Sequence, residues 1–175
     1  MLERTRKKLR EADYFLGALT SSQPGAFNKE PEAADFHLSA FVTAARAVTF
    51  VLRKEQGGVY ETWKLGWFAN LTADDKALMD FFVERRNEVQ KEGDFEYDVT
   101  VRTVSLGEFL KEFYAQGGTF YSTGMPGTPQ PTFQKVERRF AVRPEDTVPA
   151  LCRRYLDLVK QLVADFERDL ATNLG

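Results

Sequence analysis

Apolar residues recur every three or four positions along four stretches of the chain, which is the spacing of amphipathic helices. In the last stretch they form one continuous stripe, whereas in the second they surround nearly the whole helix. Pro31 suits a first helical position, and Gly57-Gly58 should end the second helix before a short aromatic helix or connector over residues 59–71. The pattern predicts helices over residues 2–20, 31–56, 73–92 and 147–172.

The period of the pattern changes to two after residue 94. Phe95, Tyr97, Val99 and Val101 alternate with polar residues, and this alternation predicts a half-buried strand. The sequence that follows, Ser105-Leu106-Gly107-Glu108, resembles a capping box, in which a serine side chain satisfies the first turn of a helix. We therefore expect a short helix directly after this strand.

Further β signals lie between residues 119 and 142. Thr119–Thr123 and Phe133–Val142 predict two more strands, and residues 124–131, rich in proline and glycine, predict the loop between them. This loop could gate a site, bind a partner or be a plain hairpin loop. Together these signals predict a β-rich insertion over residues 94–142.

These elements predict a mainly α fold. We expect an up-and-down bundle of four to five helices around one core, with the small β-rich insertion before the last helix. The 175 residues have the length of one domain, so residues 1–175 are predicted to form a single domain. The second helix is more apolar than one small bundle can cover, which predicts a homodimer.

Composition narrows the classes of function. The formal net charge of −2 offers no general attraction for nucleic acid or anionic membranes, so either would need a local basic patch. The chain has one cysteine, Cys152, and one histidine, His37, which excludes an internal disulfide and zinc-finger-type sites. We expect a cytoplasmic protein without metal or cofactor. No long uncharged apolar run occurs, so no membrane-spanning helix is expected.

Candidate chemistry gathers at the end of the helix predicted over residues 73–92. Side chains four positions apart share a helix face, so Arg86, Asn87 and Lys91 could form one polar surface with two cations and an amide. Arginine binds phosphate with two parallel hydrogen bonds, and lysine adds a point charge. The same residues also suit a solvated last turn, where cations favour the helix dipole.

Arg46 is the second candidate, because it lies among alanines in the most apolar helix. A buried guanidinium needs partners, since burying it unpaired is costly. In one hypothesis Arg46 lines a cleft opposite Arg86 and Lys91 and helps to bind a phosphate. In the other it pairs with a structural carboxylate.

The helix order and the Arg86-Asn87 pair resemble the HEPN superfamily. Its domains are helical bundles that often dimerise, and its motif is an arginine, a polar residue and then a histidine. Arg86 and Asn87 match the first two elements, and Lys91 stands where the family could place the histidine. The resemblance implies a cleft that binds phosphate and, in many members, metal-independent RNase activity.

The lysine changes what this resemblance implies about catalysis. It can stabilise negative charge, but it is a poor base near neutral pH. Our first hypothesis is therefore that the protein binds a phosphate-bearing ligand, most plausibly RNA, without cleaving it efficiently. One alternative is an active RNase of toxin or defence type. Another is a non-catalytic dimeric module whose insertion recruits a protein partner, so whether the chain is an enzyme stays open.

Overall fold

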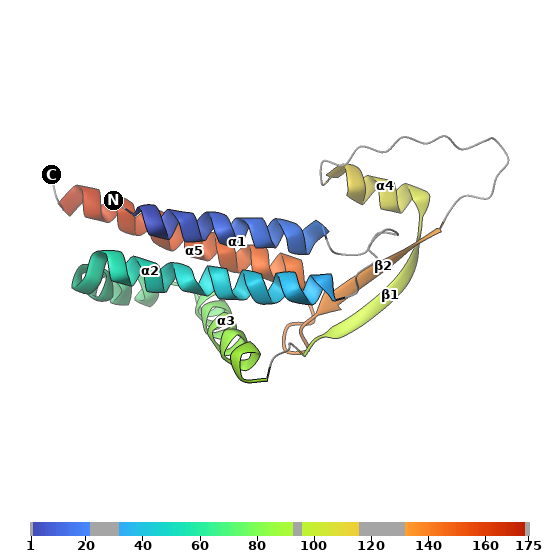
Figure 1. The fold of residues 1–175 in the computed structure, drawn as a ribbon, viewed down its shortest axis with the longest axis horizontal. Coiled ribbons are helices and arrows are strands. Elements are labelled where there is room, and N and C mark those ends of the chain that lie inside the picture. Colours follow the sequence, from blue (N-terminus) through green and yellow to red (C-terminus); the bar gives the residue numbers. More distant parts are fainter. Residues whose placement is uncertain (1, 22–31, 93–95, 116–131, 174–175) are drawn as a thin grey trace.

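Five helices and one two-stranded sheet make up the described part of the chain (Figure 1). The structure is a computed structural model and describes residues 2–21, 32–92, 96–115 and 132–173. The fold is mainly helical with a small sheet ahead of the last helix, which confirms the predicted fold class. In chain order the elements are α1 (Glu3–Ser21), α2 (Ala33–Ala69), α3 (Ala73–Glu92), β1 (Asp98–Ser105), α4 (Leu106–Ala115), β2 (Thr132–Arg139) and α5 (Val148–Asn173).

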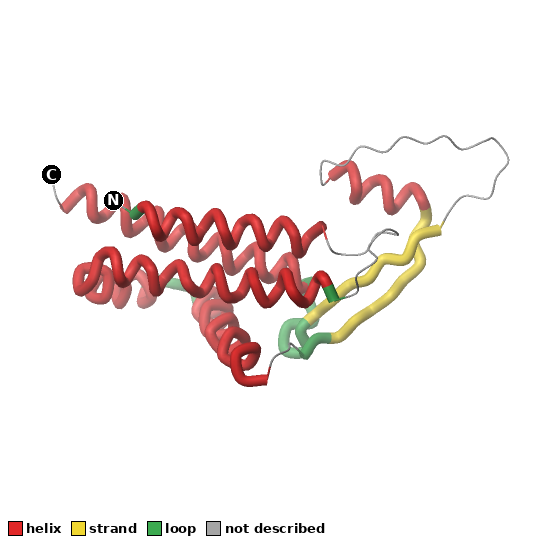
Figure 2. The backbone as a smooth tube through the Cα atoms, viewed as in Figure 1, coloured by secondary structure: helices red, strands yellow, loops and turns green. Residues whose placement is uncertain are grey.

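Helices α1, α2 and α5 lie side by side and form the body of the bundle (Figure 2). α1 runs antiparallel to α5, because Arg6 near its start pairs with Glu167 near the end of α5 (3.0 Å). A second ion pair, between Asp13 of α1 and Lys160 of α5 (2.7 Å), agrees with this antiparallel direction. The apolar stripes of α1 and α5 and the inner side of α2 face the core, and the largest side chains they bury include Leu19, Leu38, Phe41, Leu52, Leu151, Tyr155 and Phe166.

A carboxylate from α2 closes the first turn of α1. Glu55 accepts hydrogen bonds from the backbone N–H groups of Arg4 (3.0 Å) and Thr5 (3.1 Å), and from the Thr5 hydroxyl (2.6 Å). The N–H groups of a first helical turn have no acceptor within their own helix. Glu55 is therefore a helix cap supplied by another helix, and it fixes the start of α1 against α2.

Helix α2 reverses its direction at Gly57, which has φ 54° and ψ −131° within an otherwise helical run. The first segment, residues 33–56, runs antiparallel to α1 (Figure 1). The second segment, residues 58–69, runs antiparallel to α5, because its two tryptophans donate to two α5 aspartates in reverse order. The prediction that the second helix breaks at Gly57-Gly58 is thus confirmed.

Replacing Gly57 with alanine should destabilise the protein by about 1–2 kcal/mol, because residues with a Cβ rarely adopt this positive φ. An added Cβ would meet nothing within 4 Å, so the cost comes from the backbone alone. Gly58→Ala is the matched control, since Gly58 has the same open space without a positive φ. Urea denaturation measures both variants, and equal stabilities would contradict the prediction.

Helix α3 crosses the bundle at a steep angle and packs on α2 and α5 (Figure 1). It spans the predicted residues, and its first turn is capped by Thr72, whose hydroxyl oxygen accepts from the Asp75 N–H (3.1 Å). Phe82 is fully buried and stacks on Tyr155 of α5, with ring centroids 4.2 Å apart. The apolar face of α3 therefore completes the core.

The sheet projects from the bundle as a long arm with α4 at its far end (Figure 2). We call β1, α4 and β2 the arm. β1 pairs antiparallel with β2, from Asp98 opposite Arg139 to Ser105 opposite Thr132. The Glu108 N–H donates to the Ser105 side-chain oxygen (3.3 Å), so the predicted cap at the start of α4 is confirmed.

The prediction that the first strand is half-buried is wrong for most of β1. Val99 and Val101 are 54% and 56% exposed. The alternation is correct, but no second layer covers their face in the residues that the structure describes. α4 packs on the opposite face, where Val104 is buried. The predicted strand at residues 119–123 and the loop over 124–131 lie outside the described residues, and the single domain stays a prediction.

One helix of the described chain, α2, is long and apolar enough by length and composition to cross a membrane. In this fold, α2 is apolar because much of it packs in the core of the bundle. α2 reverses at Gly57, and its first segment packs against other helices of the bundle. We therefore interpret α2 as the core helix of a soluble domain.

Candidate functional site

The polar cluster predicted near the end of α3 lies in its last two turns. Arg86 donates to the side-chain oxygen of Asn87 (3.4 Å), and the Lys91 side chain is exposed. The guanidinium of Arg85 lies over the Phe81 ring, 5.3 Å from its centroid. The cations of this cluster therefore stand at the carboxyl end of a helix, where the helix dipole favours positive charge.

Arg46 makes its contacts within its own helix. Its Nη1 donates to the Thr49 hydroxyl (2.8 Å), and its guanidinium carbon lies 4.9 Å from the centroid of the Phe50 ring. Its partners are thus a hydroxyl and an aromatic ring, the latter in a cation–π contact. Within the described ranges no hydrogen bond joins Arg46 to the α3 cluster. Phosphate binding by Arg46 together with that cluster stays a prediction.

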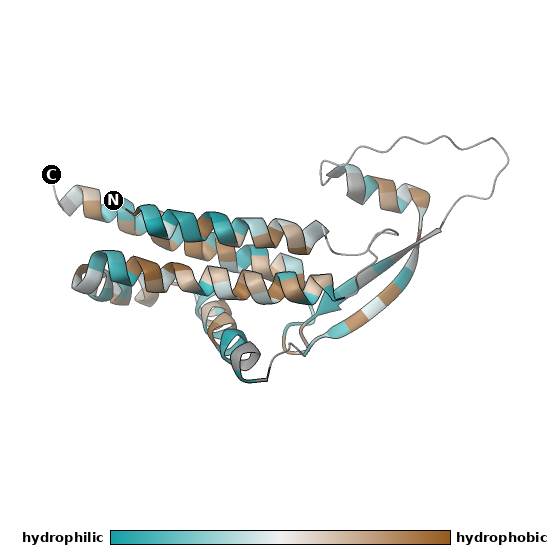
Figure 3. Cartoon of the chain, in the orientation of Figure 1, coloured by the Kyte–Doolittle hydropathy of each residue, from teal (hydrophilic) through white to brown (hydrophobic). Residues whose placement is uncertain are grey.

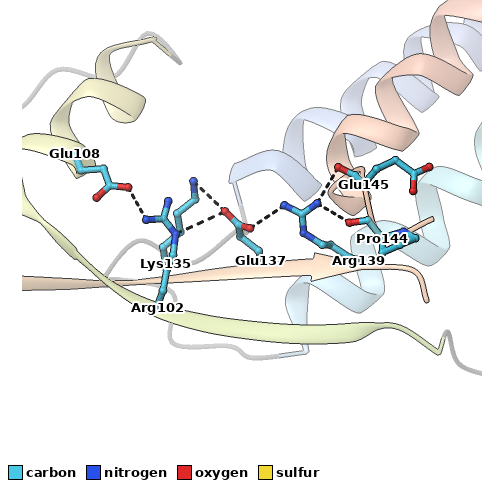
Figure 4. A network of polar contacts seen from close by, with 7 residues as sticks. All are labelled: Arg102, Glu108, Lys135, Glu137, Arg139, Pro144 and Glu145. Atoms are coloured by element: carbon cyan, nitrogen blue, oxygen red, sulfur yellow. Dashed lines mark hydrogen bonds and ion pairs between the residues drawn. The ribbon is translucent and has the colours of Figure 1, made fainter. Parts of the chain in front are cut away.

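One face of the arm holds a network of alternating charges (Figure 4). Arg102 of β1 donates to Glu108 of α4 (2.6 Å), and Glu137 of β2 accepts from Arg139 (3.0 Å). Lys135 lies 3.3 Å from the same glutamate. The hydrogen bond from Arg139 holds the pKa of Glu137 below its ordinary value, against the opposing effect of partial burial. This face therefore compensates its own cations with carboxylates.

The opposite face of the arm is open and carries exposed valines, with the buried Arg138 of β2 on the same side near its base. Val99 and Val101 point to this side together with Thr103, and all three are exposed. The sheet has two strands in the described residues, so β1 and β2 each also have one edge without a neighbouring strand. Unpaired edges present backbone N–H and C=O groups to other chains. The arm thus offers both an apolar face and backbone hydrogen-bonding groups.

Aromatic contacts anchor the base of the arm in the bundle. The Tyr97 ring packs edge-on against Phe140 (6.3 Å between centroids), which in turn packs against Phe81 of α3 (5.1 Å). Arg139 donates to the carbonyl oxygen of Pro144 (2.8 Å), just before α5. These contacts fix the arm at its base, so the exposed valines are presented from a defined position.

A groove of about 380 Å³, which was not predicted from the sequence, lies between the second segment of α2 and α5. Trp63 and Trp67 stack and donate their indole N–H groups to Asp169 (2.8 Å) and Asp165 (3.0 Å). The bond from Trp63 holds the pKa of Asp169 below its ordinary value. Arg168 pairs with both carboxylates. Because these groups satisfy one another, we interpret the groove as structural.

The other reactive side chains do not combine into a site in the described part of the chain. No group of three His, Cys, Asp or Glu residues there could hold a metal ion. Cys152 is buried in the core, and burial raises the pKa of its thiol well above the ordinary value. A thiol in this state is a poor nucleophile, because the thiolate is the reactive form.

Comparison with known proteins corrects the predicted family. A family model described as Bacteriophage lambda protein ea47 matches residues 19–171, a span that includes the arm and most of α5. None of the curated proteins and none of the solved structures matches the chain. The predicted resemblance to the HEPN superfamily is therefore wrong. It rested on helix order and on the short Arg86-Asn87 pair. Such a pair is not specific to one family, because the helix dipole favours cations at the end of any helix. The chain belongs to the family of bacteriophage lambda protein Ea47.

Proposed function

We propose that the chain is a non-catalytic protein-interaction module in which the apolar face of the arm binds a protein partner. The observation that supports this function is the exposure of Val99 and Val101, at 54% and 56%, on an arm anchored in the bundle. A projecting apolar face is a surface that a partner can cover. We assign the module to the cytoplasm, because its only cysteine is buried and unpaired, which suits a reducing compartment.

The chemistry of the arm defines the partner that fits it. The strands bear four basic and two acidic residues, so the surroundings of the valines are weakly positive. An unpaired strand edge can accept an extended segment as a third strand, in which backbone hydrogen bonds give affinity and alternate side chains give specificity. The best fit is an extended segment with apolar residues at alternate positions and carboxylates on its flanks.

The charged face of the arm argues for protein rather than RNA. Binding to a nucleic-acid backbone depends on cations that release counterions, and single-stranded bases need aromatic platforms. Here Glu108 and Glu137 pair with the arginines and the lysine of that face. The face therefore holds three cations against two carboxylates, and a surplus of one positive charge is small for RNA binding.

A photo-crosslinking residue placed at Val101, in cells that naturally contain the protein, should give a protein adduct of defined mass. The same residue at Ala164, an exposed position on α5, is the matched control. With the purified partner, Val101→Asp should weaken binding at least about tenfold, because the contact would desolvate a charge, while Ala164→Asp should leave it unchanged. Adducts that form equally at both positions would contradict the proposal.

Binding of total RNA to the purified protein tests the competing hypothesis. If the chain is an interaction module, the wild type and Arg86→Ala bind RNA equally weakly. A loss of RNA affinity in Arg86→Ala, together with crosslinks that nuclease removes, would overturn the module and support the phosphate-binding prediction.

A further inference from the structure

The first segment of α2 is rich in apolar residues (Figure 3), and the exposed ones among them give this helix an apolar outer face. Exposed side chains recur on it every seven residues, at Phe36, Thr43 and Phe50, and the two phenylalanines are 64% and 45% exposed. A period of seven keeps residues on one side of a helix, as in helices that pair along their length. The positions between them are Ser39, Ala40, Arg46 and Ala47, all partly exposed.

This outer face is symmetric about Thr43. Phe36 and Phe50 lie seven positions to either side of it. Two copies of the helix that cross antiparallel about a two-fold axis at Thr43 would therefore set each Phe36 opposite a Phe50. A two-fold interface requires one patch to complement itself in this way, residue i contacting j and j contacting i.

The residues between the phenylalanines suit the same arrangement. Ser39 and Ala47 are equidistant from Thr43, and so are Ala40 and Arg46. Small side chains allow two helix backbones to approach closely, and the alanine methyl leaves room for the guanidinium opposite. Arg46 already lies over its own Phe50 ring, which keeps its charge on an aromatic surface within such an interface.

The charges at the two ends of the face select the antiparallel orientation. Glu32 stands eleven residues before Thr43 and Lys54 eleven residues after it, and both are exposed. In the described chain neither has an ion-pair partner. Antiparallel copies would set Glu32 against Lys54 at both ends, whereas parallel copies would set like charges together. Antiparallel helix dipoles favour the same orientation.

We propose that this outer face of α2 is the interface of a homodimer, with the two-fold axis passing beside Thr43. A second copy is the occupant because the face complements itself in its aromatic positions, its small residues and its charges. At about 1.5 Å per residue, the segment over residues 33–56 is long enough to hold both aromatic pairs and both charge pairs in one contact. This interface is independent of the arm, because the arm lies between α3 and α5 in the chain.

Charge reversal tests the orientation, with light scattering and sedimentation at micromolar concentration as the readouts. The wild type should be a dimer. Glu32→Lys and Lys54→Glu should each weaken the dimer about tenfold, since each turns two attractive pairs into repulsive ones. The double variant should regain wild-type affinity, because the pairs reform with exchanged signs. Arg153→Glu, at an exposed position of α5, is the control and should have no effect.

A cysteine at the two-fold axis gives a second test that does not depend on charge. Thr43→Cys should form an intermolecular disulfide on mild oxidation, because a residue beside the axis meets its own copy within the Cα distance of about 7 Å that a disulfide spans. Ala164→Cys should not, and the buried Cys152 does not compete. A monomeric wild type would overturn the proposal. So would a dimer that neither charge reversal weakens and Thr43→Cys does not crosslink.

Discussion

Replacing Phe82 with alanine is expected to lower the free energy of unfolding by about 3–5 kcal/mol, the usual cost of truncating a fully buried phenylalanine. The Phe82 ring joins three helices. It stacks on Tyr155 of α5 at an interplanar angle of 12° and packs edge-on against Phe41 of α2. The substitution would remove both ring contacts and leave a cavity where α3 meets the rest of the core.

Chemical denaturation followed by circular dichroism measures this loss, with Leu65→Ala as the control. Leu65 is 70% exposed, so its truncation should change stability by less than about 0.5 kcal/mol. If Phe82→Ala cost no more than the Leu65 variant, α3 would not pack on the core as the structure shows.

Replacing Glu55 with alanine should cost about 2–3 kcal/mol. One carboxylate accepts three hydrogen bonds from Arg4 and Thr5, and hydrogen bonds to charged groups are stronger than neutral ones. The Thr5 side chain is buried, and its hydroxyl would lose the carboxylate that accepts its hydrogen bond. Glu55→Gln keeps one acceptor oxygen and removes the charge, and it should fall between the wild type and the alanine variant.

The contribution of Glu55 should also depend on pH. Burial opposes ionisation, but the hydrogen bonds from Thr5 and from the Arg4 N–H outweigh it and hold the pKa below the ordinary 4.5. A pKa that is lower in the folded state gives stability that is fully present above the unfolded value and is lost as pH falls through the folded value. The stability difference between the wild type and Glu55→Gln should therefore be constant near neutrality and shrink below about pH 4.5. A difference that grows on acidification would contradict this assignment.

Helices and breaks could be predicted because the rules behind them act within a few residues. α3 begins at Ala73 and ends at Glu92, as the apolar spacing predicts, and Gly57 marks a reversal that depends on the φ of one residue. Whether a strand is buried cannot be predicted from a few neighbouring residues. The alternation around Val99 and Val101 identifies a strand, yet only the tertiary fold decides whether a second layer covers it.

Contacts between distant segments explain why the candidate site was harder to predict. Whether Arg46 faces Arg86 depends on the angle at which α3 crosses α2, and no local pattern encodes that angle. The hydrogen bonds from Trp63 and Trp67 to α5 are partly visible in the sequence. The two tryptophans are four residues apart, and so are the two aspartates that accept their hydrogen bonds. Matching the two pairs still requires knowledge that the segments run antiparallel.

The chain leaves the bundle at Asp98 and returns at Arg139, and these two residues are partners in the β ladder. Such partners have Cα atoms only about 5 Å apart, so for the bundle the whole arm is equivalent to a very short connection. The entropy of closing a loop grows slowly with its length, and here the ladder itself holds the ends together. Insertions, deletions or exchange of the outer arm should therefore leave the folding of the bundle nearly unchanged. This topology allows the tip of the arm to change while the helices keep one scaffold.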